Sequence, residues 1–248
     1  MSFALAVTTV LFSAADPQGD ALGDGAYQLP LAAQSQVSSL DLRTFTAYNT
    51  DGRLGFRLGF AALSNAQGGP NGFSLPHIQV FLAEHRGGEE ALGSSGFRTQ
   101  AGRGWQYHLT ATGWFAKLEC LPSMTVNGPG CPKTVRARTE GADIVLETDL
   151  PAKAYAYWAV VGLYDPLAVD GLRQPILQAS PLELSSSITD APAALDVLSK
   201  SSQLALWPSR EVPALGEVVV QTNPLLWTGL IGLCLTVLGV VLNLFRKR

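Results

Sequence analysis

Short hydrophobic runs alternate with turn-forming residues along most of the chain. The runs are rich in β-branched and aromatic side chains, and Gly, Pro, Asn or Asp separate them. This pattern is typical of antiparallel strands and not of helices, and it predicts an all-β sandwich. The strands expected from it are Ser39–Tyr48, Leu54–Leu63, Ile78–Glu84, Trp105–Thr110, Thr134–Arg138, Asp143–Thr148 and Tyr157–Tyr164.

Two further segments predict local structure within this body. Asn49, Asp51 and Gly52 have the chemistry of a hairpin turn between two strands. Ala191–Lys200 is the one strong helix candidate ahead of the C-terminal segment, because Asp190 can cap it and apolar residues recur on one side.

The C-terminal segment differs from the rest of the chain. Residues 224–245 carry no charge, and a helix of this length crosses about 30 Å of hydrocarbon. Trp227 stands near its start, and the basic residues 246–248 follow it, which places the C-terminus in the cytoplasm. We expect one transmembrane helix over 224–245, joined to the body by a stalk over 216–223. A buried helix of the body is the alternative, and the nearly complete lack of polar side chains disfavours it.

The N-terminus supports two interpretations. Residues 1–15 are apolar and end in small residues, which resembles a secretory signal peptide without its usual basic start. Alternatively, Val7–Ala14 is the first strand of the domain, because it is rich in Val, Thr, Leu and Phe.

Composition narrows the classes of function. Hydrophobic residues make up 47% of the chain and charged residues only 15%, with 25 Gly and 15 Pro, as in a turn-rich sheet protein. The formal net charge is -3. An acidic body without a basic stripe excludes nucleic acid as an expected partner, because phosphate binding needs clustered Lys and Arg.

The three cysteines fit an exported body. Cys120 and Cys131 frame a short turn-rich loop that a disulfide can close in an oxidising compartment. A zinc site is the alternative, but the loop holds no His and the chain has no second Cys pair nearby. Cys234 lies in the expected transmembrane span, where it is a small apolar residue.

Asp16, Asp20 and Asp24 recur at intervals of four residues near the N-terminus. In a looped chain their oxygens can converge on a hard cation, so they are candidate ligands of a structural calcium ion. Asp and Gly also suit turns in general, and the spacing is not that of an EF-hand.

Several segments occur in an order that resembles a known family. They are Phe12–Pro30, Leu40–Tyr48, Gly68–Phe81 with its GGPNGFSL block, Trp158–Arg173 and Leu195–Leu198. Together, over roughly residues 7–215, they resemble the C-terminal module of glucodextranase and of related pullulanases. This sequence departs from the family at Ala21, where an acidic residue is common, and at Leu182–Ile188, which replaces a glycine-rich stretch.

The resemblance implies an immunoglobulin-like or DOMON-like β-sandwich that binds carbohydrate, is sometimes surface-layer-like, and is not itself catalytic. The residues agree with the last point, because the chain has no GxSxG, HExxH or phosphate-loop motif. We therefore expect that the protein is not an enzyme.

Aromatic and amide side chains are the expected sugar contacts. Aromatic rings cover the apolar face of a sugar, and an amide both donates to and accepts from hydroxyls. The candidates are Trp105, Tyr107 and Trp114, with Asn71 and Gln79 at the polar edge. For each of them a place in the core or in a turn is the competing interpretation.

These observations predict a membrane-anchored, extracytoplasmic module that binds polysaccharide or cell-envelope glycan without turning it over. The body would lie outside the cell, with a single C-terminal span. The alternative is a structural protein of the cell envelope or surface layer that contacts other proteins and binds no sugar.

Overall fold

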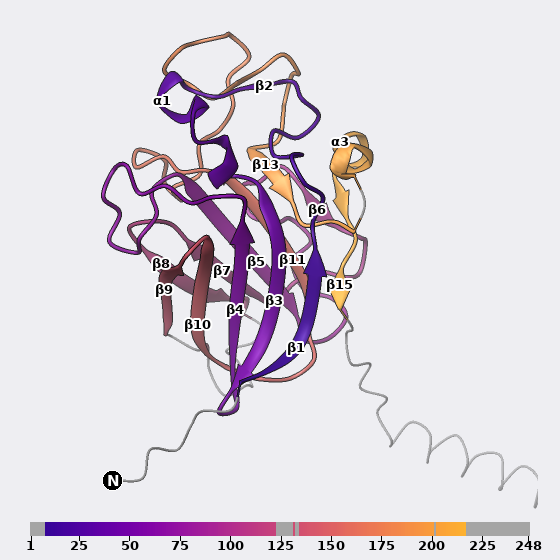
Figure 1. The fold of residues 1–248 in the computed structure, drawn as a ribbon. Coiled ribbons are helices and arrows are strands. Elements are labelled where there is room, and N and C mark those ends of the chain that lie inside the picture. Colours follow the sequence, from indigo (N-terminus) through magenta and orange to yellow (C-terminus); the bar gives the residue numbers. More distant parts are fainter. Residues whose placement is uncertain (1–7, 123–130, 132–133, 201, 217–248) are drawn as a thin grey trace, which may run out of the picture. The chain divides into compact units, whose positions relative to one another are not determined.

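Two antiparallel sheets face each other in the computed structural model, which describes residues 8–122, 131, 134–200 and 202–216 (Figure 1). The first sheet has the strand order β1-β3-β4-β10-β9. The second has the order β13-β11-β5-β7-β8, and β15 also pairs with β11. The sheets form the all-β sandwich that the sequence predicts.

The strands of the first sheet are β1 Thr8–Ala15, β3 Leu42–Thr50, β4 Arg53–Phe60, β9 Val135–Glu140 and β10 Asp143–Pro151. Those of the second are β5 Pro76–Ala83, β7 Tyr107–Ala111, β8 Ala116–Cys120, β11 Ala156–Leu163, β13 Ala194–Val197 and β15 Leu215–Gly216. The short elements outside them are β2 Tyr27–Gln28, β12 Ser185–Ser186, β6 Arg98–Thr99, β14 Glu211–Val212, α1 Leu31–Gln34, α3 Leu206–Ser209 and the 3-10 turns Val37–Ser39 and Gln203–Ala205.

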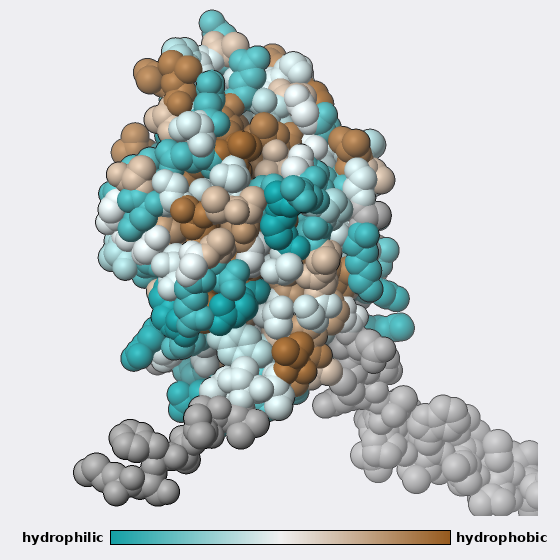
Figure 2. Space-filling view, in the orientation of Figure 1, coloured by the Kyte–Doolittle hydropathy of each residue, from teal (hydrophilic) through white to brown (hydrophobic). Residues whose placement is uncertain are grey.

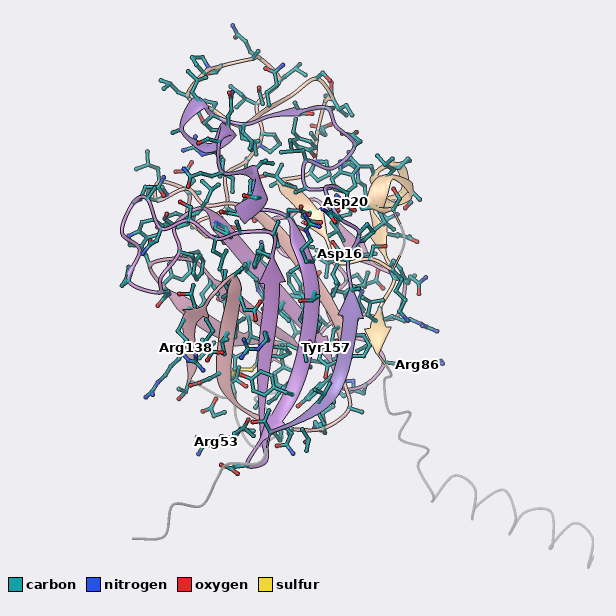
Figure 3. The ribbon with its side chains drawn as sticks, in the orientation of Figure 1. Asp16, Asp20, Arg53, Arg86, Arg138 and Tyr157 are labelled. Carbon is teal, nitrogen blue, oxygen red and sulfur yellow. A yellow bond between two sulfur atoms is a disulfide. The ribbon has the colours of Figure 1, made fainter. Side chains whose placement is uncertain are left out.

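Aromatic side chains from both sheets meet in the core. Tyr157 of β11 packs against Phe45 of β3, with ring centroids 5.5 Å apart, and against Phe56 of β4 at 6.2 Å. Phe12 of β1 stacks on the same tyrosine at 5.3 Å. Figure 3 shows Tyr157 among the strands of the sandwich. Each such pair adds about 0.5–1.5 kcal/mol beyond the burial of its area.

The outer faces of the two sheets differ in how they are covered. In β4, buried Leu54, Phe56 and Leu58 alternate with outward positions that include Arg53 and Arg57, so this face meets solvent. In contrast, β5 and β11 are buried along their whole length. Residues 84–106 and the C-terminal segment 203–215 cover the outer face of the second sheet.

Hydrogen bonds connect these covering segments to the sheet and its flank. The amide of Ala194 in β13 donates to the carbonyl of Ser95 at 3.0 Å, and Trp158 of β11 donates to that of Val212 at 3.0 Å. Gly93 lies directly against the side chain of Gln79 on β5. A sheet covered on both faces needs apolar side chains at consecutive positions, which explains the continuous burial of β5 and β11.

The strands predicted from the sequence are present, with ends shifted by a few residues. The predicted hairpin turn joins β3 to β4, where Asn49 Oδ1 accepts from the Gly52 amide at 2.8 Å. Asp51 and Gly52 both have positive φ, at 51° and 82°, as such a turn requires. The strand β8 was not predicted.

The helix predicted over Ala191–Lys200 is wrong. Ala194–Val197 forms β13, which pairs with β11 at the edge of the second sheet. All four of its side chains are buried, and a short apolar run of this kind suits a buried strand as well as a helix. Asp190, the expected cap, has a φ of 54° and ends a turn instead.

At the N-terminus, residues 8–15 form β1, paired with β3, and residues 1–7 lie outside the described part. Among the described residues, no helix is long and apolar enough to cross a membrane. The segment 224–245, where the sequence predicts a span, lies outside the described residues, as do the basic tail and the predicted stalk beyond Gly216.

Candidate functional site

The turn between β7 and β8 presents an exposed tryptophan. Trp114 is 38% exposed, whereas Trp105, Trp158 and Trp207 are buried. The Trp114 ring stacks on Tyr164, with centroids 4.5 Å apart and ring planes 17° apart. One face of the indole is therefore covered by a second ring, and solvent reaches the remainder.

Hydrogen bonds within the turn fix the backbone that carries Trp114. Thr112 Oγ1 accepts from the amides of Trp114 and Phe115, both at 3.1 Å. Asn71 adds two bonds from outside the turn. Its amide N donates to the carbonyl of Gly113 at 2.9 Å, and its side-chain Nδ2 donates to that of Thr112 at 2.8 Å.

Two glycines let the loop around Asn71 approach this turn closely. A Cβ on Gly113 would lie 2.0 Å from the carbonyl oxygen of Phe73, and one on Gly69 would lie 2.1 Å from the same atom. The GGPNGFSL block that carries the family resemblance is thus the support on which the Trp114 turn rests.

Neighbouring residues also hold Tyr164 in place. Its backbone amide donates to the carbonyl of Leu75 at 3.0 Å, and Phe115 meets its ring edge-on at 6.5 Å. The loop after it exposes Leu167 and Val169 almost fully, at 91% and 109%. We refer to Trp114 and Tyr164 as the aromatic platform. A rigid, amphipathic ring surface of this kind suits the apolar face of a sugar.

The other expected sugar contacts are not at the surface. Three of them are buried, so the prediction that they face a bound sugar is corrected: Trp105 is 8% exposed, Tyr107 7% and Gln79 2%. Trp105 packs against Phe81 of β5, and its Nε1 donates to the carbonyl of Ala91 in the preceding loop. Tyr107 faces the core, and its hydroxyl donates to Glu84 at 3.0 Å. Asn71 lies beside the platform, but its Nδ2 is committed to the turn.

A hollow of about 880 Å³ lies on the solvent-facing side of the first sheet, which sequence reasoning missed. Tyr48 lines it and lies against Gly55 of the neighbouring strand. Figure 2 shows a hydrophilic area over β9, β10 and β4 on this side. The alternating polar positions of these strands are the signal that could have found it. Its other lining residues include Thr46, Thr50, Arg53, Arg57, Arg138, Glu140, Glu147 and Thr148.

Ion pairs connect the charged groups of this hollow. Arg57 pairs with Glu140 and, at 2.8 Å, with Asp143, while Arg138 pairs with Glu140 and, at 3.1 Å, with Glu147. The hydrogen bonds from Arg138 and Arg57 lower the pKa of Glu140. The residues that line the hollow include three arginines and, with Asp51, three carboxylates, so their formal charges cancel and leave the hollow without a strong preference for a charged ligand.

Acidic side chains gather at the end of β1. Asp16, Asp20 and Asp196 each bring a carboxylate oxygen within 4.8 Å of the others, and Figure 3 shows Asp16 and Asp20 side by side there. Burial raises the pKa of Asp16 to about 7 and raises that of Asp196 well above its usual range. Asp24 is not part of the group, because its Oδ1 accepts from the Ala26 amide at 3.1 Å in a local turn. The predicted set of calcium ligands, Asp16, Asp20 and Asp24, is therefore corrected: Asp196 takes the place of Asp24 in the acidic group.

The disulfide prediction is confirmed. Cys120, at the end of β8, is bonded to Cys131 across a sequence separation of 11 residues. Neither sulfur is therefore available as a zinc ligand.

A comparison with known families identifies the family to which the chain belongs. A family model described as the C-terminal binding-module, SLH-like, of glucodextranase matches residues 11–204, from β1 to the 3-10 turn after β13. No curated protein matches the chain. The match confirms the resemblance drawn from the GGPNGFSL block and its neighbours, and the chain belongs to the family of the SLH-like C-terminal binding module of glucodextranase.

Proposed function

We propose that this protein is a non-catalytic module that binds polysaccharide or cell-envelope glycan through the aromatic platform. The observation that carries the proposal is the partly exposed side chain of Trp114, stacked on Tyr164, in a member of a binding-module family. A sugar stacked on this side chain covers apolar surface, while its hydroxyls stay in contact with water.

The platform is rigid before any ligand arrives, and that favours binding. The hydrogen bonds from Asn71 and Thr112 hold the turn, and Tyr164 holds the indole ring. Binding then orders few side chains, which lowers its entropic cost. Asp165, which follows Tyr164 in sequence, pairs with Arg173 at 3.3 Å, and both groups can bond to hydroxyls.

The test is a glycan-array and polysaccharide pull-down screen with the purified full-length chain. Trp114→Ala removes the platform, and Leu31→Ala is the control, because Leu31 of α1 is also an exposed apolar residue, at 64% against 38% for Trp114. Tyr48→Ala probes the hollow on the first sheet. We expect binding that Trp114→Ala weakens at least tenfold and that the two other variants retain.

Each other result argues against a part of the proposal. Loss of binding in Tyr48→Ala alone would show that the glycan binds in the hollow on the first sheet and not at the platform. Absence of binding to every glycan by folded protein would reject the carbohydrate function. The fully exposed Leu167 and Val169 then favour the second candidate, an envelope protein whose contacts are with other proteins.

We also propose that the sandwich lies outside the cytoplasm and is anchored by residues 224–245, with the C-terminus inside. The Cys120–Cys131 disulfide supports an oxidising compartment, and the uncharged segment followed by basic residues supports the anchor. Protease treatment of intact cells should digest the sandwich and spare a tag placed after residue 248. Recovery of the chain in the soluble fraction, or protection of the sandwich, would contradict this arrangement.

A further inference from the structure

The carboxylates at the end of β1 come from three places in the sequence. Asp16 follows the last residue of β1, Asp20 lies in the loop after it, and Asp196 is in β13 of the opposite sheet. One oxygen from each falls within 4.8 Å of the other two. Two oxygens bound to one calcium ion at about 2.4 Å are at most about 4.8 Å apart, so these three side chains are close enough to share one ion.

Each of these side chains offers an oxygen without a hydrogen-bond partner. Asp196 is fully buried, and its Oδ2 accepts from the amide of Leu42 at 2.7 Å, whereas Oδ1 has no partner. Asp16 accepts from the amide of Ser199 at 2.6 Å through Oδ1, and its Oδ2 has none. Both oxygens of Asp20 are buried and unpartnered. Buried carboxylate oxygens without partners are costly unless a cation or a proton compensates them.

Among the described residues, Arg43 is the cation beside this group. Its charge lowers the pKa of Asp20, but it pairs with Asp41 at 2.7 Å, and the pKa values of Asp16, Asp20 and Asp196 are still raised. Asp41 also adds to the electrostatic field that Asp16, Asp20 and Asp196 already impose on one another. A divalent cation with oxygen ligands supplies the missing charge directly.

We propose that Asp16, Asp20 and Asp196 bind one calcium ion. The ion joins the end of β1 to β13 and so links the edges of the two sheets. The amides of Leu42 and Ser199 orient Asp196 and Asp16, which leaves the free oxygens directed at the ion. This site is separate from the aromatic platform, and its existence does not depend on glycan binding.

The experiment uses the full-length chain stripped with EDTA. Calcium chloride is titrated by calorimetry, with magnesium chloride as the comparison ion, and denaturant unfolding is followed with and without calcium. Asp20→Asn is the main variant, because neither of its oxygens holds a hydrogen bond that the fold needs. Asp24→Asn is the matched control from the same segment, since Asp24 lies outside the group. Asp196→Asn tests the buried ligand.

We expect one calcium per wild-type chain, an affinity at least tenfold weaker in Asp20→Asn, and wild-type affinity in Asp24→Asn. The stability order of wild type and Asp20→Asn should also invert. The variant is the more stable in EDTA, because one of the repelling charges is gone, and the less stable in calcium. If Asp196→Asn fails to fold, this inversion still decides the matter.

Three results would overturn the proposal. The first is wild-type protein that binds no calcium at millimolar concentration, as expected if the carboxyls simply share protons. The second is calcium binding that Asp20→Asn leaves unchanged. The third is a loss of affinity in Asp24→Asn as large as in Asp20→Asn, which would indicate a general effect of surface charge.

Discussion

Asn71 donates from its side-chain Nδ2 to the carbonyl of Thr112 at 2.8 Å, and through this bond the GGPNGFSL block supports the turn that carries the exposed tryptophan. Thr112 in turn accepts from the amide of Trp114. In the proposed function, Asn71 therefore acts through the turn, as a positioning residue and not as a direct sugar contact. The GGPNGFSL block then contributes to binding through the shape that it gives to the neighbouring turn.

Asn71→Asp should weaken glycan binding about tenfold, because it keeps the size of the side chain and removes the donor to Thr112. Loss of this bond should also lower the free energy of unfolding by about 1–2 kcal/mol. Gln34→Ala is the control, since Gln34 makes a similar amide-to-carbonyl bond to Leu29 at 3.1 Å in α1. It should cost similar stability and leave binding intact. Equal losses of affinity in the two variants would reject the positioning role.

Gly113→Ala should lower the free energy of unfolding by about 3 kcal/mol, because the new Cβ would lie 2.0 Å from the backbone oxygen of Phe73. The matched variant is Gly68→Ala. Its Cβ would meet nothing within 4 Å, so only the φ of 69° opposes the substitution, at about 1 kcal/mol. Urea denaturation of both variants gives the comparison. A similar cost in the two would show that the loop and the turn are not in close contact.

The sequence predicts the strands well because period-two alternation and turn residues are local signals. The same signal cannot tell Trp105 from Trp114. Both lie beside strands of the second sheet, but the loop before Trp105, which includes Ala91, lies against its ring and leaves it 8% exposed, whereas Trp114 is 38% exposed. Whether a sheet face is covered depends on the path of a loop outside the strand, and alternation along one strand does not record that path.

The acidic group shows the same limit. Asp16 and Asp20 are close in sequence, so their proximity is predictable, whereas Asp24 continues the spacing but caps a local turn. Asp196 comes from β13, whose sequence also suits a helix, and it joins the group only through the pairing of β13 with β11. Contacts between sequence-distant segments depend on topology, and the spacing of residues in the chain does not encode them.

Replacing Cys120 and Cys131 together by Ser should lower the free energy of unfolding by about 3 kcal/mol. The bridge closes a loop with a sequence separation of 11 residues, and removing it restores that loop's entropy in the unfolded chain. Dithiothreitol should destabilise the wild-type protein by a similar amount and leave the double variant unchanged. A double variant that the reductant destabilises further would show that the effect does not come from this bridge.

The pH dependence of stability should include a contribution from His108. Its ring stacks on Phe81 with centroids 4.2 Å apart, and burial, with the charge of Lys117, lowers its pKa to about 3. The unfolded chain, with a histidine pKa near 6.5, takes up the proton first as the pH falls. The contribution of His108 to the free energy of unfolding is therefore fully present above about pH 6.5. Below that pH it is lost progressively, and the loss reaches roughly 2 kcal/mol at pH 5.

His108→Gln, which stays neutral at every pH, should remove that part of the pH dependence when urea denaturation is compared at pH 7.5 and pH 5. His77 is also buried and has a lowered pKa, so part of the slope should persist. His85→Gln is the control, since His85 is exposed and solvent reaches its ring in both states. If His108→Gln lost as much stability on acidification as the wild type, His108 would have to be protonated in the folded protein, and its packing against Phe81 could not be the cause of the acid sensitivity.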